Sequence, residues 1–186
     1  MLHLRQFVVE YKRRLDAGSL TVPLVGICFG HQLIGHSLGG LTTRNPYQPG
    51  GWRFCEGSAA VELDPAIYEQ AWARAAAAAF GRAPSRFIHK SHGDAVARLP
   101  PGARLWGKSA ECGVEVYTLG DRILCFQGHP ELLDMYCERH ARELRDLRVY
   151  SDADVQATLD SLRQHPPERD FWRALIVGFL QQQQPS

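Results

Sequence analysis

The sequence predicts a single α/β domain, in which helices and strands alternate around a buried sheet. Residues 21–27 form a continuous apolar run with several β-branched side chains, which is typical of a parallel strand buried on both faces. Helical periodicity precedes that run at 1–16 and follows it at 30–38. A chain of 186 residues suits one domain with a sizeable core, so we expect residues 1–186 to fold as a unit.

The first three elements follow from local signals. Residues 1–16 carry an apolar helix face made of Leu4, Phe7, Val8, Tyr11 and Leu15. Pro23 belongs at the start of the strand, because further along it would remove a ladder hydrogen bond. The helix over 30–38 is expected to stop at Gly39-Gly40, where a left-handed backbone can end it.

The remaining elements are shorter and more mixed. Residues 44–57 are rich in proline, glycine and tryptophan and predict a loop, whereas 67–80 contains five consecutive alanines and predicts a helix. Short strands are predicted at 59–63, 86–89, 105–107, 114–118 and 123–126, with a hairpin turn at Gly120-Asp121. Helices are predicted at 132–149, 152–164 and 168–181, with a frayed tail from about residue 181.

Composition excludes several classes of function. The formal net charge is +1 and basic residues form no stripe, so we expect no nucleic-acid partner. No apolar run approaches the roughly 20 residues needed to span a bilayer, so we expect no membrane insertion. The five cysteines are scattered, and the N-terminus lacks the pattern of a signal peptide. These features predict a reduced, cytoplasmic protein.

A candidate nucleophile lies between the buried strand and the following helix. In Gly26-Ile27-Cys28-Phe29-Gly30, the sharp turn strains the central residue and the flanking glycines are expected to relieve crowding. The turn raises the sulfur of Cys28 above the sheet edge at a helix N-terminus, where the dipole favours the reactive thiolate. It also directs the N–H of Phe29 toward the oxyanion that forms on attack. The alternative is a buried structural cysteine in a glycine-rich turn.

A candidate base follows the apolar strand 123–126. His129 comes directly after that strand, and parallel sheets place catalytic groups at the carboxyl ends of their strands. Glu131, two residues later, could hold the second nitrogen of the imidazole. Cys28, His129 and Glu131 therefore predict a nucleophile, a base and an orienting carboxylate. Taken alone, His-x-Glu is a weak signal, and a surface histidine is its ordinary explanation.

These motifs resemble a known family. Residues 26–32, Gly-Ile-Cys-Phe-Gly-His-Gln, and 128–131, Gly-His-Pro-Glu, look like the two signatures of class I glutamine amidotransferase domains. Residues 90–94, Lys-Ser-His-Gly-Asp, are similar to the segment that lines the glutamine pocket. The run from Ala95 to Ala103, followed by Gln127, favours the stand-alone subgroup that includes γ-glutamyl peptidase-like proteins.

The resemblance implies a doubly wound, mostly parallel sheet of the flavodoxin-like type and hydrolysis of a glutamine or γ-glutamyl amide through a glutamyl thioester. Carried over by position, Cys28 attacks the carbonyl, His129 protonates the leaving ammonia or amine, and Glu131 orients His129. Gln32 and the backbone around Ser91 and His92 would hold the small-molecule substrate. No cofactor is implied. The partner would be a second copy of the chain or a synthase subunit.

The chain departs from the family pattern before residue 22. Members normally have about fifty further residues there, which supply the first strands and a glycine-rich turn that completes the oxyanion hole. We therefore expect an N-terminally truncated domain that lacks those strands. Loss of one oxyanion donor typically lowers turnover by ~10²–10³. The alternative is a catalytically impaired remnant that serves as a binding or regulatory module.

A metal site is a third interpretation of the motifs. Cys28/His31 and Cys137/His140 are two Cys-x-x-His pairs, and zinc takes such ligands. The spacing lacks the paired cysteines of a zinc knuckle, and such short motifs match often by chance. We therefore expect no metal at either pair.

Overall fold

The computed structural model describes residues 2–45 and 54–181. A six-stranded sheet has the strand order β1-β8-β7-β6-β3-β4, and β2 and β5 form a separate two-stranded sheet. The strands are β1 (Leu24–Ile27), β2 (Leu41–Arg44), β3 (Cys55–Leu63), β4 (Ser85–His92), β5 (Asp94–Arg98), β6 (Ala103–Lys108), β7 (Val116–Leu119) and β8 (Ile123–Phe126). The helices are α1 (Leu2–Asp16), α2 (Phe29–Ser37), α3 (Arg74–Phe80), α4 (Asp134–Asp146), α5 (Asp152–Gln164) and α6 (Arg169–Gln181).

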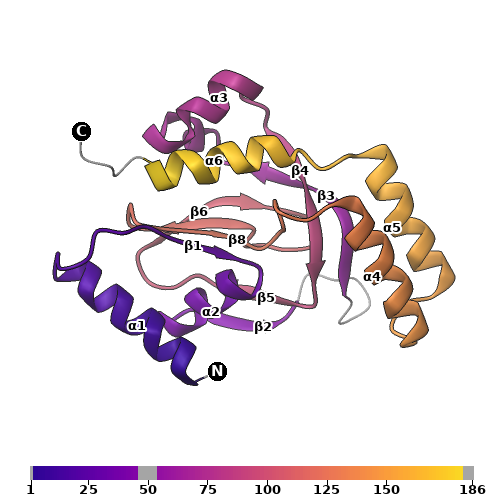
Figure 1. The fold of residues 1–186 in the computed structure, drawn as a ribbon, viewed down its shortest axis with the longest axis horizontal. Coiled ribbons are helices and arrows are strands. Elements are labelled where there is room, and N and C mark those ends of the chain that lie inside the picture. The colour runs from indigo at the N-terminus through magenta and orange to yellow at the C-terminus, as the bar shows by residue number, and fades with distance from the viewer. Residues whose placement is uncertain (1, 46–53, 182–186) are drawn as a thin grey trace.

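Helices cover the large sheet on both sides (Figure 1). Helices α1 and α2 lie against one face, α3 and α6 lie against the other, and α4 and α5 pack beside β3 and β4. Strand β8 is buried on both faces because its side chains alternate. Ile123 and Cys125 point into the core beneath α1 and α2, whereas Leu124 and Phe126 point into the core beneath α6. This burial explains the continuous apolar sequence of the strand.

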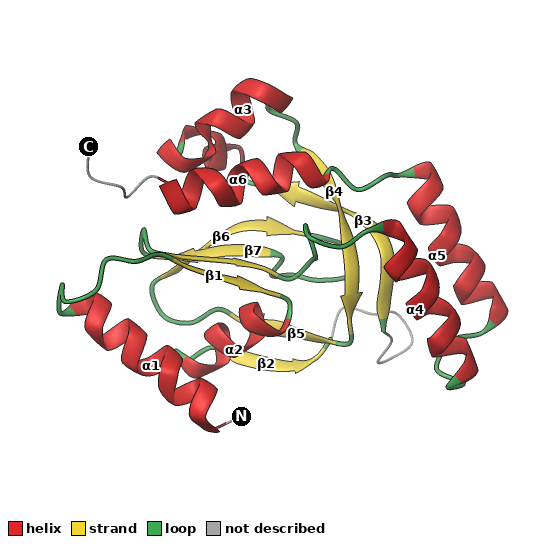
Figure 2. Cartoon of the chain, in the orientation of Figure 1, coloured by secondary structure: helices red, strands yellow, loops and turns green. Residues whose placement is uncertain are grey.

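The predicted α/β class is confirmed, and the direction of the strands is more mixed than a doubly wound sheet implies (Figure 2). Strands β1 and β8 are parallel, with Ile27 opposite Phe126. The pairings β8–β7, β7–β6, β6–β3 and β3–β4 are antiparallel. The expectation of mostly parallel strands therefore holds only at β1–β8 in the described residues. Short connections, such as the turn at Gly120-Asp121, can join only antiparallel neighbours.

The helix predicted over 67–80 is broken. Two 3₁₀ turns, Pro65–Glu69 and Ala71–Ala73, precede α3, and Gln70 between them is extended at φ −68° and ψ 137°. The break lets the Trp72 backbone approach α6 so closely that a Cβ on Gly178 would lie 2.1 Å from the Trp72 carbonyl oxygen. Tertiary packing therefore overrides the helix propensity of this segment.

Other predicted boundaries shift for similar reasons. Strand β3 begins at Cys55, inside the predicted loop over 44–57, because it pairs with β4 along its length. Residues 46–53 of that loop, and the tail from 182, lie outside the described residues. Strands β2 and β5 were not predicted, and they form by pairing with each other. The helix predicted over 132–149 is α4 and spans only Asp134–Asp146.

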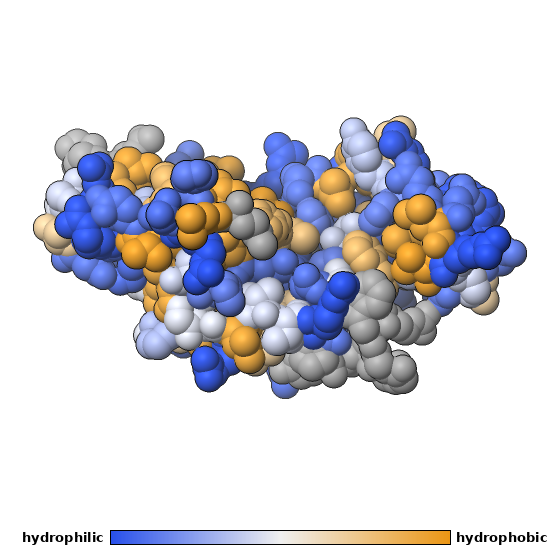
Figure 3. All heavy atoms as spheres, turned by 90° about the horizontal axis from the view of Figure 1, so that it is seen from below, coloured by the Kyte–Doolittle hydropathy of each residue, from blue (hydrophilic) through white to orange (hydrophobic). Residues whose placement is uncertain are grey.

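Helix α1 buries less of its apolar face than predicted. Val8 and Tyr11 are buried against α2 and the sheet, and the Tyr11 hydroxyl donates a hydrogen bond to the Val22 carbonyl at 2.5 Å. Leu4 and Phe7 are instead exposed. Figure 3 looks at the molecule from below, and apolar residues appear there in several separate groups among hydrophilic ones. Among the described residues, no helix is long and apolar enough to cross a membrane.

Replacing Gly178 with alanine tests the contact between Trp72 and α6. Alanine favours a helix by up to ~1 kcal/mol over glycine, but the added Cβ would collide with backbone. We expect Gly178→Ala to lower the free energy of unfolding by ~1–3 kcal/mol. Urea denaturation measures this change, with Val177→Ala, at an exposed neighbouring position, as the control. A more stable Gly178→Ala protein would contradict the packing described.

Candidate active site

Cys28 lies between β1 and α2, in a backbone conformation that residues other than glycine rarely adopt. Its φ is 47° and its ψ is −103°. Hydrogen bonds hold this geometry on both sides. The Cys28 N–H donates to the Phe126 carbonyl at 2.8 Å, and the Cys28 carbonyl accepts from the Gln32 N–H at 3.0 Å. The strained turn that the sequence predicts is therefore present.

The two glycines that flank this turn have different surroundings. A Cβ on Gly26 would lie 2.7 Å from the Ile34 side chain and 2.9 Å from the Gly30 backbone. A Cβ on Gly30 would meet no described heavy atom within 4 Å. The expectation that both glycines relieve crowding is thus correct for Gly26 and wrong for Gly30, which faces open space.

The Cys28 thiol contacts two polar groups from distant parts of the chain. Its Sγ lies 3.6 Å from the Ser91 carbonyl oxygen and 3.8 Å from Nε2 of Gln127. Gln127 is fully buried, and its Oε1 accepts a hydrogen bond from Nε2 of Gln32 at 3.2 Å. Gln127 therefore links the turn at Cys28 to α2. The motif around His129 contains Gln127, but its spacing does not predict this contact.

His129 is held on one side by Glu131 and turns its other nitrogen inward. Nδ1 of the ring lies 2.6 Å from Oε1 of Glu131. The backbone N–H of His129 donates to the His89 carbonyl at 2.8 Å. Nε2 is buried on the opposite side of the ring from Glu131. Burial by itself would lower the pKa of His129, but the Cys28 thiol and the Glu131 carboxylate outweigh it and raise the pKa to about 10. The raised pKa favours the protonated imidazole ring at neutral pH.

The four residues predicted to bind the oxyanion or the substrate make different contacts. Phe29 begins α2, so its N–H is one of those without a partner inside the helix. Gln32 donates from Nε2 to the Asp94 carbonyl at 2.8 Å. Ser91 presents its carbonyl to the thiol. The His92 ring is buried, donating from Nδ1 to the Asp94 carbonyl, and burial together with Lys90 lowers its pKa to about 3. The His92 side chain is therefore neutral.

A polar cluster behind Ser91 was not predicted. Oε2 of Glu56 lies 2.7 Å from Nδ1 of His140 and accepts a hydrogen bond from the Ser91 hydroxyl at 3.0 Å. The Glu56 side chain is fully buried, and this burial raises its pKa despite the bonds from His140 and Ser91. The sequence offers no local signal for this cluster, because β3, β4 and α4 bring the three residues together.

A buried ion pair forms at Lys90 on β4, next to Ser91 in the sequence. The Lys90 ammonium pairs with the Glu115 carboxylate, and both side chains are almost completely buried. The Glu115 carboxylate also accepts from the Ser109 hydroxyl at 2.5 Å, and its carbonyl accepts from the Gln127 N–H at 2.8 Å. The pair therefore fixes β4 and the segment that leads to His129. The spacing of Lys90 and Glu115 in the sequence does not predict this pair.

The two Cys-x-x-His pairs do not combine into a metal centre. His31 is buried with its ring 4.8 Å from that of Tyr117, and burial lowers its pKa to about 3. His140 is paired with Glu56 as described. Among residues 2–45 and 54–181, no group of three or more histidine, cysteine, aspartate or glutamate side chains is arranged to hold a metal ion.

Two cavities are lined by residues close to Cys28. One, of about 320 Å³, is lined by His129, Ser91, Leu132 and Tyr136 among others. The other, of about 350 Å³, lies over α2 and includes Phe29 in its lining. Each has a volume at the lower end of the range for small-molecule sites.

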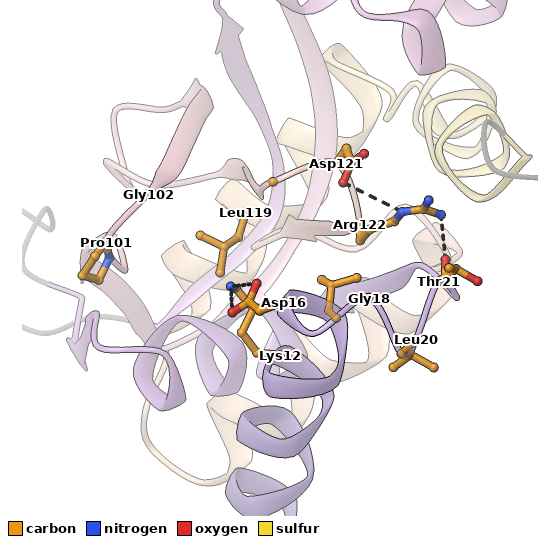
Figure 4. Close-up of a pocket in the computed structure, with 12 residues that line it drawn as sticks. Lys12, Asp16, Gly18, Leu20, Thr21, Pro101, Gly102, Leu119, Asp121 and Arg122 are labelled. Carbon is orange, nitrogen blue, oxygen red and sulfur yellow. Dashed lines mark hydrogen bonds and ion pairs between the residues drawn. The ribbon is translucent and has the colours of Figure 1, made fainter.

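A larger cavity of about 500 Å³ lies elsewhere and holds none of the candidate catalytic residues (Figure 4). It lies near the N-terminal ends of β1 and β8. Cys28 and His129 instead follow the C-terminal ends of these two strands. Its charged groups are already paired. Lys12 binds Asp16 at 2.5 Å, and Arg122 donates to the Thr21 carbonyl at 2.6 Å. Its size alone does not make it the reactive site.

Comparison with known proteins identifies the family. The family model for glutamine amidotransferase class-I matches residues 6–136, a span that contains Cys28, His129 and Glu131. The chain belongs to the class-I glutamine amidotransferase family. The expected resemblance is thereby confirmed.

Among relatives of this amidotransferase chain, γ-glutamyl peptidase 4 of Arabidopsis thaliana is 29% identical over 172 residues, covering 92% of the chain and 64% of the relative. One of the subunits of the glutamine-hydrolysing GMP synthase of Halobacterium salinarum is 34% identical over 115 residues, covering 61% of the chain and 55% of the relative. The chain thus spans less than two thirds of the length of these relatives.

Solved amidotransferase structures have the same fold. A glutamine amidotransferase from Thermotoga maritima superposes with a TM-score of 0.65 at 19% identity, covering 96% of this chain and 70% of that one. A glutamine amidotransferase from Methylobacillus flagellatus gives a TM-score of 0.66 at 16% identity, with coverages of 97% and 70%. At these identities the likeness establishes the shared fold.

The two glycines of the nucleophile turn provide a matched pair of variants. Gly26→Ala forces a Cβ against backbone, so we expect a loss of ~1–3 kcal/mol in the free energy of unfolding. Gly30→Ala places the same atom in open space, and we expect a change within ~0.5 kcal/mol. Chemical denaturation of both variants measures the difference. Equal losses would show that the turn does not have the described geometry.

The titration of His129 tests its contact with the thiol. We expect a pKa of about 10 in the native protein, and in Cys28→Ala a pKa that falls toward the ordinary value of ~6.5. Because folding raises this pKa, the resulting stabilisation is complete below ~pH 6.5 and is lost as the pH rises through about 10. The NMR signals of the histidine rings report the titration. As a control, the His92 ring should stay neutral above pH 5, so its signals should not shift there. A native His129 midpoint between pH 6 and 7 would contradict the contact.

Proposed function

We propose that this chain uses Cys28 to hydrolyse the side-chain amide of glutamine or of a γ-glutamyl compound. The observation that carries the proposal is the strained Cys28 turn beside the His129–Glu131 pair. A thiol at a helix N-terminus with an adjacent imidazolium has the groups needed for acyl transfer. The similarity to a γ-glutamyl peptidase and to glutamine-hydrolysing GMP synthases supports the same class of substrate.

The reaction proceeds in two balanced steps. The Cys28 thiolate attacks the amide carbon. The oxyanion that forms accepts a hydrogen bond from the backbone N–H of Phe29. His129 gives its proton to the leaving nitrogen, the C–N bond breaks, and a glutamyl thioester forms as ammonia or an amine departs. Neutral His129 then removes a proton from water, which attacks the thioester. The C–S bond breaks, glutamate leaves, and the thiolate and imidazolium are restored. Glu131 keeps Nδ1 oriented throughout.

The cavity over α2 has groups suited to the glutamyl part of the substrate. It is lined by Gln32 and by the oppositely charged side chains of Arg5 and Asp94, and the Asp94 carboxylate also lies 3.7 Å from the Arg44 guanidinium. A glutamyl group carries an α-carboxylate and an α-ammonium, which such a pair would complement. The cavity lies beside Phe29, so a substrate anchored there can direct its amide toward the thiol.

The acceptor of the product depends on what the chain associates with. A partner synthase would use released ammonia, as the relationship to GMP synthase suggests, whereas peptidase action on a γ-glutamyl conjugate requires no partner. A second copy of the chain is the other candidate partner. All five cysteines are free thiols, which is compatible with a reducing compartment such as the cytoplasm.

A second candidate function is a non-catalytic binding or regulatory module. Strand β1 pairs on one side only, with β8, in the described part of the chain, and Phe29 is the one oxyanion donor identified there. A lost donor lowers turnover by ~10²–10³ and need not weaken ligand binding. The two candidates therefore differ in turnover and agree in binding.

A glutamine analogue with a diazo-ketone in place of the amide tests the nucleophile. We expect it to alkylate Cys28 in the folded protein, because the attacking sulfur lies beside a proton donor. Peptide mass mapping identifies the labelled residue, with Cys28→Ala as the unlabelled control. The buried thiols Cys125 and Cys137 serve as internal controls. Labelling at another cysteine, or none, would overturn the assignment.

Ammonia release from glutamine separates the two candidates. Turnover that disappears in Cys28→Ala and falls at least ~10²-fold in His129→Ala supports the hydrolase. Labelling at Cys28 without ammonia release favours the binding module.

A further inference from the structure

The cavity beside His129 lies on the side of the site toward which the leaving group must move. His129 lines this cavity with Ser91, Leu132 and Tyr136, and the cavity volume is about 320 Å³. A proton donor must reach the nitrogen that departs, within about 3 Å. A leaving nitrogen that takes a proton from His129 would lie beside that ring, and the cavity that His129 lines offers space for a substituent on the nitrogen. Ammonia has no substituent and would leave this space unused.

The charged side chains around the cavity are already paired. Glu56 binds His140 at 2.7 Å, and Arg139 binds Glu143 at 2.7 Å. The Arg139–Glu143 pair carries no net charge, and the Glu56 carboxyl group is buried and hydrogen-bonded, so neither offers a free charge to an ionic substituent. The bond between Glu56 and His140 also restrains α4 against β3, which keeps this side of the cavity in place.

The remaining wall is apolar and partly open to solvent. Leu132, which precedes α4, and Tyr136, in the first turn of α4, supply it, and Tyr136 is 54% exposed. Among the described residues, the Tyr136 hydroxyl forms no hydrogen bond, so the ring is not held by a polar contact. An aromatic surface of this kind gains most from contact with another apolar or aromatic group.

We propose that this cavity is the subsite for the leaving amine, and that the chain acts on γ-glutamyl amides whose amine carries an apolar or aromatic group. The inference rests on the proposed hydrolysis at Cys28 and specifies its substrate. Leu132 and Tyr136 bind the substituent, and His129 protonates the nitrogen that bears it. Glu56 and His140 position the wall and do not contact the reacting atoms.

Two synthetic substrates that differ by one ring test the subsite. Binding of γ-glutamyl benzylamide and γ-glutamyl methylamide to Cys28→Ala is measured by calorimetry, which requires no turnover. We expect the benzylamide to bind at least ~10-fold more tightly, since burying one ring in a fitted pocket gives this order of discrimination. Adding Tyr136→Ala should reduce the ratio of the two affinities to about 1–3. Tyr136→Phe keeps the ring and should preserve the ratio. Met135→Ala, at an exposed neighbour outside the cavity, should leave both affinities unchanged.

The possible outcomes separate this inference from the proposed hydrolysis. Equal affinities for the two amides, no binding of either, or a ratio that survives Tyr136→Ala would each overturn the subsite. If the ratio depends on Tyr136 but Cys28 is not labelled by the diazo-ketone, the subsite stands as a binding site and the hydrolysis fails. If Cys28 is labelled and glutamine is hydrolysed while the ratio is 1, the hydrolysis stands and the subsite fails.

Discussion

The parallel pairing of β1 with β8 is the constraint on which the site depends. It sets Ile27 opposite Phe126, so the chain leaves both strands at the same edge of the sheet. Cys28 follows one strand end, and the segment from Gln127 to His129 follows the other. The hydrogen bond from the Cys28 N–H to the Phe126 carbonyl ties the strained turn directly to that pairing. A slip of one residue would exchange the faces of the strand and separate the thiol from the imidazole.

The buried charges behind this edge keep it rigid. Lys90 and Glu115 form an ion pair with almost no solvent contact, and Glu56 is held by His140 and Ser91. Such pairs contribute little net stability, because desolvation offsets their attraction. Removing one partner would leave an uncompensated buried charge, which costs about 3–5 kcal/mol. Their effect is therefore to fix β4, whose Ser91 carbonyl contacts the thiol.

The two cavities divide the proposed substrate by its chemistry. The cavity over α2 contains Arg5 and Asp94, which suit the charged end of a glutamyl group. The cavity beside His129 has charged and polar groups that are bonded to one another, and Leu132 and Tyr136 give it an apolar side, which suits an amine substituent. The reacting amide would lie between them, at the thiol. This arrangement accounts for a general acid on one side of the nucleophile and an oxyanion donor on the other.

The sequence by itself determined the α/β class, the strand–turn–helix around Cys28, and the positions of His129 and Glu131, because each follows from local patterns. Continuous apolar runs, glycines at a sharp turn and a two-residue spacing can all be recognised without knowing which segments meet. Only the tertiary structure decided the mixed direction of the strands, the break at Gln70 and the clusters around Glu56 and Lys90. Those features depend on which strands pair and on how closely helices such as α6 approach, and a linear sequence does not display contacts between distant residues.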